Sequence, residues 1–266
     1  MTKSGRAALI ALALVVALWP VLFLLLASLA SGTAFDAGFS GRSVHAYTGV
    51  VEESGFARIL VLTVLVALGV AVATVLIAAP AGYSFARHKS RLAAISANSL
   101  LSAWLLPQIL VALAFFNLVA QLNLYGSPGL MLFFGVLQTV PLSVWVLRSS
   151  FERIPVEIDE AASLDGAGLL ATLRRVVVPV AMPSIAASAG YAFLLAWQMY
   201  LYPLVFLAGQ KTQMASVGVV NFVGEWSTNY PEMMAFSVIV TAPVVVVFLL
   251  VQRYIVAGLM AGSVVG

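Results

Sequence analysis

Long apolar runs separated by short polar segments make up most of this chain. A helix needs about twenty apolar residues to cross the hydrocarbon core of a bilayer. The runs that reach this length cover residues 7–30, 57–84, 93–120, 128–147, 184–208 and 232–256. The pattern therefore predicts an all-α, polytopic membrane protein with six transmembrane helices, and we expect residues 1–266 to form a single transmembrane domain.

The first two runs differ from a simple span. The first resembles a secretory signal, since Lys3 and Arg6 precede it and Ala27–Ala30 is similar to a cleavage site. Its apolar stretch is much longer than the roughly 7–15 residues of a signal core, so we expect an uncleaved helix. The second run is longer than a crossing needs and carries Pro80 and Gly82 near its end, which predicts a kink or a helical exit into the cytoplasm.

Composition supports a membrane protein independently of the pattern. Hydrophobic residues make up 62% of the chain and charged residues 9%, with a mean hydropathy of +1.08. A soluble domain carries about 25% charged residues. The chain has no cysteine, which excludes disulfides, thiol catalysis and cysteine-bound metal. The net charge of +3 does not indicate nucleic acid, because in a bilayer protein the location of the charges matters more than their sum.

Positive charges are unevenly divided between the segments that connect the runs. If the N-terminus is cytoplasmic, ten of the thirteen positive residues are also cytoplasmic. They are Lys3, Arg6, Arg87, Lys89, Arg91, Arg148, Arg153, Arg174, Arg175 and Arg253, whereas Arg42, Arg58 and Lys211 lie outside. Cytoplasmic loops of membrane proteins carry the excess of Lys and Arg. We therefore expect both termini, and the connection at 148–183, on the cytoplasmic side of the membrane.

The connection at 148–183 is a polar island in an apolar chain. Nine charged residues lie between Arg148 and Arg175, while the flanking spans are nearly uncharged. Such a segment is long enough to bind a soluble partner protein. The alternative is an amphipathic segment lying on anionic headgroups. Helices of that kind are usually rich in Lys and Arg on their polar face, but the first half of this segment is acidic.

Within this island the sequence predicts two short helices. Acidic residues Glu157, Asp159 and Glu160 follow Pro155 and favour the first turn of one helix, and Gly166 permits a sharp break after it. A second helix is expected over Leu169–Val178, with Arg174 and Arg175 in its last turn and Pro179 ending it.

The spacing of residues in the island is specific. Glu160-Ala161-Ala162 is followed after three residues by Gly166, then after nine by Val176, with Val178-Pro179 next. This order resembles the EAA loop of ABC-importer permeases, through which a membrane subunit docks into a cleft of its ATPase. The resemblance implies a cytoplasmic coupling helix whose contact residues are Glu160, Ala161, Ala162, Leu164, Asp165 and Gly166.

The side chains of this motif suit a docked helix. Ala161 and Ala162 are small, so the helix can lie close inside a groove of the partner. Leu164 offers an apolar knob, and Glu160 offers a carboxylate to an Arg or Lys of the partner. Asp159 and Glu160 are adjacent carboxylates, but we expect them on a solvated loop without a catalytic cleft.

Similarity to one branch of this family extends along the chain. The segments Gly82–Arg87 and Phe151–Pro155, Pro107, the pair Pro141 and Trp145, and the ending Gln252–Gly266 are similar to carbohydrate-type importer permeases. The ending resembles the second permease subunit of maltose-class importers. The resemblance implies a second permease, two ATPase subunits and an extracytoplasmic solute-binding protein as partners, and transport by alternating access.

Enzyme chemistry has no support in the sequence. The two histidines, His45 and His88, lie far apart on opposite predicted sides, so neither a metal site nor a Ser-His-Asp triad is expected. No Gly-rich phosphate loop ending in Gly-Lys-Ser/Thr occurs. We expect a non-catalytic subunit that binds no cofactor, with ATP and Mg²⁺ held by the partner ATPase.

Polar residues inside the spans are amides and hydroxyls, without charges in the central stretches. This argues against a proton relay or a clamp for a charged solute. Helical spacing places Trp104 with Gln108 on one face of the third span and Gln198 with Tyr202 on one face of the fifth, while Gln138 lies in the fourth. Amides bond hydroxyl groups and aromatic rings stack on sugar faces, so these residues predict a path for a neutral hydroxylated solute.

Other interpretations remain open at this point. The amides can instead bridge helices, and the aromatic rings can fill packing or interfacial positions. An ABC importer for a glycerophosphodiester or a peptide would share the loop motif. A secondary transporter or channel, or a structural scaffold, would share the spans but work without an ATPase.

Overall fold

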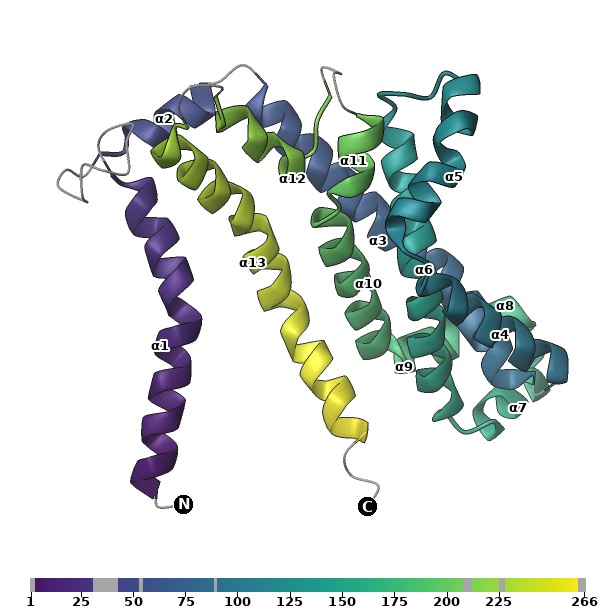
Figure 1. Cartoon of the computed structure of the whole chain (residues 1–266). Helices are drawn as coiled ribbons and strands as arrows, with labels where there is room; N and C mark the ends of the chain where they lie inside the picture. Colours follow the sequence, from purple (N-terminus) through teal and green to yellow (C-terminus); the bar gives the residue numbers. More distant parts are fainter. Residues whose placement is uncertain are drawn as a thin grey trace. The chain divides into compact units, whose positions relative to one another are not determined.

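A computed structural model of the chain is helical through most of the described part, which also contains turns and isolated bridge residues such as the pair Val223 and Thr228 (Figure 1). It describes residues 3–30, 43–52, 55–88, 90–207, 212–224 and 228–262. The predicted all-α class is confirmed. Lys89, Lys211 and the last four residues of the expected carboxyl-terminal signature lie outside the described residues.

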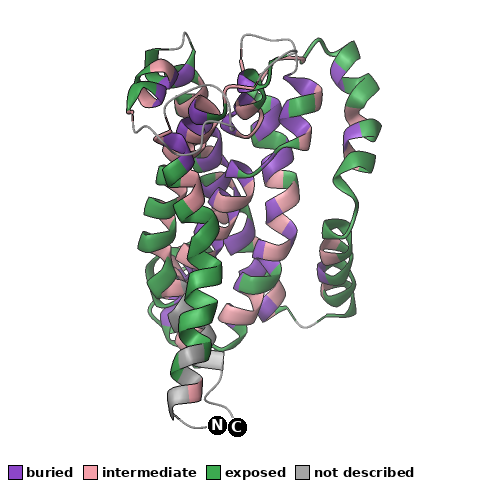
Figure 2. Cartoon of the chain, turned by 60° about the vertical axis from the view of Figure 1, so that its left-hand side comes forward, coloured by how far each residue is buried: buried purple, intermediate pink, exposed green. Residues whose placement is uncertain are grey.

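Among the described residues, four helices are long and apolar enough to cross a membrane. They are α1 (Lys3–Ser28), α3 (Phe56–Arg87), α6 (Pro128–Glu152) and α13 (Tyr230–Gly262). They coincide with the first, second, fourth and sixth predicted runs. α3 continues as a helix through Pro80 to Arg87, so neither Pro80 nor Gly82 ends the helix of the second predicted span. α1 is exposed along nearly its whole length (Figure 2), as expected of a helix that faces lipid or another subunit.

The third predicted run is not one straight helix. α4 (Arg91–Trp104) and α5 (Gln108–Gln121) meet at an angle of 91°. The break falls at Leu105–Pro107, where proline lacks an N–H and disfavours helical geometry in the residue before it. The expectation of a continuous span over 93–120 is therefore corrected to a broken span or a re-entrant segment.

The fifth predicted run, 184–208, is also interrupted. α10 (Met182–Trp197) ends before Gln198, and α11 (Leu201–Phe206) follows after three residues. Pro203 cannot donate to the Met199 carbonyl four residues earlier, and Ser216 Oγ donates to that carbonyl instead at 2.6 Å. The Ser216 side chain, which lies outside the run, thus supplies the hydrogen-bond donor for the backbone carbonyl at the break.

The second helix of the polar island differs from its prediction. α8 (Leu169–Thr172) leads into a π turn, η2 (Leu173–Val177), and then into α9 (Val178–Val180). Pro179 lies inside α9 and does not end the helix. The wide π turn before it relieves the clash of the proline ring with a preceding carbonyl. The chain bends by 85° only at Ala181, before α10.

The chain forms two compact units, Met1–Leu60 with Val217–Pro243, and Val61–Ser216 with Val244–Gly266. The first contains α1, α2 (His45–Glu52) and η3 (Val219–Phe222). Its Phe236 ring lies 5.7 Å from Phe56 and 5.2 Å from Phe222. α12 (Ala215–Gly218) spans the boundary. The second unit contains α7 (Glu157–Leu164) and every candidate site residue.

Small residues allow close helix packing in the second unit. A Cβ atom at Gly135 of α6 would lie 2.5 Å from Val70 of α3, and one at Gly190 of α10 would lie 2.5 Å from Val251 of α13. Ser150 Oγ donates to Ser184 Oγ at 2.7 Å and links α6 to α10. Packing of small residues and hydrogen bonds between helices are the usual means of association within a membrane.

Candidate functional site

The α7 helix begins and ends as its sequence predicts. Glu157, Asp159 and Glu160 occupy its first turn, where the positive end of the helix dipole favours carboxylates. Gly166 has φ of +81°, the left-handed conformation that glycine adopts without strain. Its N–H donates to Ser163 at 3.0 Å, and the Ala167 N–H donates to Ala162 at 2.9 Å. These two bonds form a Schellman motif, so the predicted sharp break at Gly166 is confirmed.

One face of α7 has no cover within the described chain. Glu160, Ala161 and Asp165 are exposed, and Leu164 is 90% exposed. Leu169 and Leu170 of α8 add apolar surface and are 70% and 76% exposed. Exposed leucines beside carboxylates suit a contact with another protein.

Ala162 lies on the other face of α7. It is only 9% exposed and is buried inside this chain. The expectation that Ala161 and Ala162 both contact a partner is therefore corrected. Ala161 remains available to a partner, whereas the small size of Ala162 allows α7 to approach the rest of its own unit.

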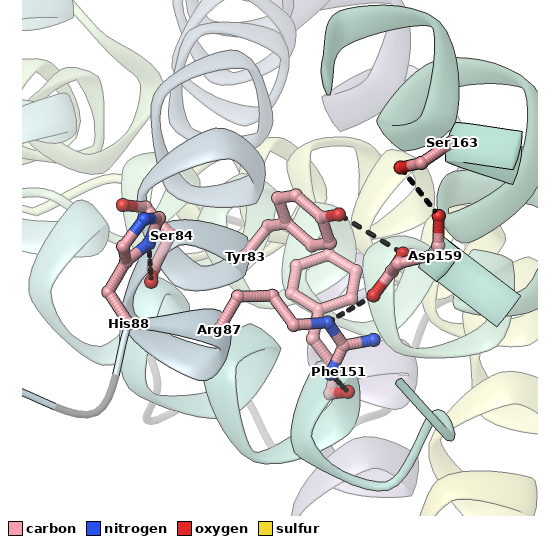
Figure 3. A network of polar contacts seen from close by, with 7 residues as sticks. All are labelled: Tyr83, Ser84, Arg87, His88, Phe151, Asp159 and Ser163. Carbon is pink, nitrogen blue, oxygen red and sulfur yellow. Dashed lines mark hydrogen bonds and ion pairs between the residues drawn. The ribbon is translucent and has the colours of Figure 1, made fainter. Parts of the chain in front are cut away.

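Polar contacts attach α7 to the end of α3 (Figure 3). Asp159 forms an ion pair with Arg87 Nε and accepts a hydrogen bond from the Tyr83 hydroxyl at 3.1 Å. Arg87 Nη1 also donates to the Phe151 carbonyl near the end of α6 at 3.0 Å. Sequence reasoning did not assign these roles to Tyr83, Arg87 and Asp159. Arg87 at the end of a span was the available signal, but nothing in the sequence pairs it with a residue 72 positions away.

A cavity of about 380 Å³ lies among α4, α5, α6, α10 and α11. Four of the five predicted path residues line it: Trp104, Gln108, Gln138 and Tyr202. Tyr191 lines it as well. Within the described chain the Tyr191 hydroxyl is buried and makes no hydrogen bond. Gln198, the fifth predicted residue, does not line the cavity; it is exposed at the end of α10.

The bend at Pro107 brings Trp104 and Gln108 to this cavity. Trp104 ends α4 and Gln108 begins α5, so the shared helical face expected from their spacing does not exist. Phe115, which that face would also include, instead lines an apolar pocket with Phe133. Trp145 lines a further pocket with Asn98 and Ser102. The polar cavity therefore depends on the broken span.

The chain is similar to known transport proteins over most of its length. Residues 76–260 match the family described as binding-protein-dependent transport system inner membrane component. A putative ABC transporter permease protein of Streptomyces antibioticus is 35% identical over 80% of this chain and 93% of its own length. The trehalose/maltose transport system permease protein MalG of Thermococcus litoralis is 29% identical, over 95% of this chain and 93% of its own.

The fold is also found in a solved structure. A chain of a bacterial ABC transporter involved in the import of the acidic polysaccharide alginate matches with a TM-score of 0.77 and 22% identity, covering 96% of this chain and 98% of its own. A secondary transporter or channel is not favoured by these similarities. The match of the family model to most of the chain, together with the apolar helices, identifies a multi-pass inner-membrane protein. The chain belongs to the inner membrane components of binding-protein-dependent transport systems, the permease subunits of ABC importers.

Proposed function

We propose that this chain moves a sugar, or a similar neutral hydroxylated solute, through the membrane as a permease subunit of an ATP-driven importer. The observation that supports this proposal most directly is the cavity beside Pro107. Its lining combines the amides of Gln108 and Gln138, the hydroxyls of Tyr191 and Tyr202 and the Trp104 indole, with no charged side chain. Amides and phenols bond sugar hydroxyls, and an indole ring stacks on the apolar face of a sugar ring.

Relatives with named solutes support a sugar. They include a trehalose transport system permease of Mycobacterium tuberculosis, 30% identical over 83% of this chain, and a maltodextrin transport system permease of Bacillus subtilis, 27% identical over 89%. A glycerophosphodiester carries a negative charge, and the cavity lining offers no cation to pair with it. A sugar is therefore the better solute for this site.

The proposed complex contains a second permease, two ATPase subunits and an extracytoplasmic solute-binding protein. ATP and Mg²⁺ are held by the ATPase, and this chain binds no cofactor. The uncovered face of α7 docks into the ATPase: Leu164 fills an apolar depression, and Glu160 and Asp165 face cations. Gly166 ends the docking helix and turns the chain toward α8.

The proposed orientation places both termini and α7 in the cytoplasm. ATP binding closes the ATPase pair, α7 follows that motion, and the spans open the cavity to the opposite side in alternating access. Solute delivered by the binding protein then reaches the Trp104 and Gln108 side chains from outside.

Uptake by the purified importer reconstituted in vesicles tests this function. We expect ATP-dependent uptake of a radiolabelled sugar from a panel containing trehalose, maltose and a maltodextrin. Glycerophosphocholine and a tripeptide should not be taken up. Uptake driven by an ion gradient without ATP, or uptake of the peptide alone, would contradict the proposal.

A further inference from the structure

Three helix ends meet at the contact between Arg87 and Asp159. Arg87 is the last residue of α3, Phe151 lies in the last turn of α6, and Asp159 lies in the first turn of α7. The Arg87 guanidinium contacts the other two elements at once, through the ion pair with Asp159 and the hydrogen bond to the Phe151 carbonyl (Figure 3). A cation also interacts favourably with the carbonyl end of a helix.

The contact is shielded from water. The side chains of Arg87 and Asp159 are 12% and 15% exposed, whereas ion pairs that contribute little are generally well exposed. The Tyr83 ring covers the guanidinium at 5.6 Å and packs edge-on against Phe151 at 5.9 Å. Both carboxylate oxygens of Asp159 are bound by residues of α3. The geometry of the contact is therefore fixed from several sides.

Apart from the bonds made by Asp159, α7 is held by contacts with α8 and η2 of the same connection and by apolar packing. It is eight residues long, and an isolated helix of that length is not stable in water. Ile158 and Ala162 pack it against its own unit, while its opposite face is uncovered. The bonds made by Asp159 are the charged and directional part of its attachment to the end of a span.

We propose that Arg87 and Asp159 are positioning residues that join α7 rigidly to the end of α3, so that a movement imposed on α7 moves α3 with it. The inference rests on the proposed docking of α7 to the ATPase and names the joint that transmits this docking to a span. Arginine suits the role because its planar fork binds two acceptors in fixed directions, which the lysine ammonium group does not do.

The distance between two spin labels tests the joint. Ser84→Cys and Ser163→Cys place labels on α3 and α7 in a chain that has no cysteine of its own, and both positions are exposed. In the assembled importer we expect one narrow distance distribution that is the same without nucleotide and after trapping with ATP and vanadate. Asp159→Asn should broaden the distance distribution and make the mean distance shift on trapping. Without the ion pair, α7 moves with the ATPase while α3 does not move with it.

Two further variants make the result specific. Glu152→Gln is the matched control: it breaks the Arg148–Glu152 ion pair, which lies within α6 and is 29% and 41% exposed, and the label distance should not change. Tyr83→Phe removes only the hydroxyl bonded to Asp159 and should broaden the distribution less than Asp159→Asn. It also serves as the test variant if Asp159→Asn does not fold.

Some outcomes overturn the joint and others concern only the docking. A distance that shifts on trapping in the chain with native Asp159, or one that stays narrow and constant in Asp159→Asn and Tyr83→Phe, overturns the proposal. Failure of the ATPase to associate with the unsubstituted chain counts against the docking function instead. In that case the label distance is measured in this chain without the ATPase. If its distribution is equally narrow with native Asp159 and in Asp159→Asn, Asp159 does not hold α7 and the joint is overturned.

Discussion

Thr74 of α3 and Thr139 of α6 join two membrane spans through a hydrogen bond of 2.6 Å between their hydroxyl groups. Thr139 Oγ1 also donates to the Gly135 carbonyl at 2.8 Å. The Thr74 hydroxyl is therefore the donor in the bond between the two threonines. Both threonines are buried, at 0% and 1% exposure. The contact joins α3 to α6, the helix that contributes Gln138 to the cavity.

Removing this bond should weaken the chain only slightly. Thr74→Val keeps the shape of the side chain, and Thr139 keeps its bond to Gly135. Hydrogen bonds between membrane helices contribute about 0.6 kcal/mol on average. We therefore expect a loss of that size in the free energy of unfolding in detergent, measured by denaturant titration. A loss several times larger would mean that the bond orders more of the unit than these two helices.

A side chain at Gly135 should be much more harmful. The Cβ atom of Gly135→Ala would lie 2.5 Å from Val70, closer than non-bonded carbon atoms approach. Overpacking of this kind costs about 1–3 kcal/mol. Val70→Ala in the same chain should restore part of the stability by making room. Gly168→Ala is the control, since its Cβ would meet nothing within 4 Å, and it should unfold like the unsubstituted protein.

Gln138 and Gln198 were both expected to line the solute path, but they differ in their position relative to the cavity. Gln138 lines it and Gln198 does not. Gln138→Leu should raise the KM for sugar uptake, because a lost hydrogen bond of about 0.5–1.5 kcal/mol corresponds to a roughly twofold to tenfold weaker interaction. Gln198→Leu should leave KM unchanged. Equal effects of the two substitutions, with normal assembly of the complex, would favour a helix-bridging role for both amides.

The sequence is informative where one local cause decides the structure. The length of the apolar runs predicts α1, α3, α6 and α13, since a helix needs about twenty apolar residues to cross the bilayer. The acidic first turn of α7 and the left-handed Gly166 follow from the helix dipole and from glycine geometry.

Distant contacts could not be predicted in this way. Pro107 indicates a weak point in a helix, but Pro80 and Pro141 lie inside helices that are not broken, so a proline alone does not predict the 91° bend. Trp104 and Gln108 were expected together because of helical periodicity, and they do meet, but through the bend. The pairing of Arg87 with Asp159 and the burial of Ala162 depend on how α7 folds back on α3, which one sequence does not reveal.

Orientation can be tested by labelling, because the chain contains no native cysteine. His45 in α2 and Asp165 after α7 are both exposed. In intact cells, a membrane-impermeant maleimide should label His45→Cys. It should label Asp165→Cys only after permeabilisation, because α7 is proposed to lie in the cytoplasm. Labelling of Asp165→Cys from outside would exclude docking of α7 to a cytoplasmic ATPase.

A substitution at Leu164 tests docking without affecting folding, because this side chain is 90% exposed and contributes little to the stability of its own chain. Leu164→Ser should therefore leave the thermal unfolding of the isolated subunit unchanged. If the side chain is buried in the ATPase, its loss removes about 1.5–3 kcal/mol of binding, a tenfold to hundredfold weaker association. Affinity purification through a tag on this chain, followed by quantification of the ATPase that remains bound, measures that loss.

Leu92 provides the matched control for this substitution. It is 77% exposed in the first turn of α4 and lies outside the proposed docking residues 160–166. Leu92→Ser makes the same substitution at another exposed leucine, and the ATPase should remain bound. If Leu164→Ser also retains it, Leu164 is not an anchor, and the contact must depend on Glu160 or on the exposed leucines of α8. If Leu92→Ser loses the ATPase as readily as Leu164→Ser, the effect comes from a general loss of apolar surface and not from docking at α7.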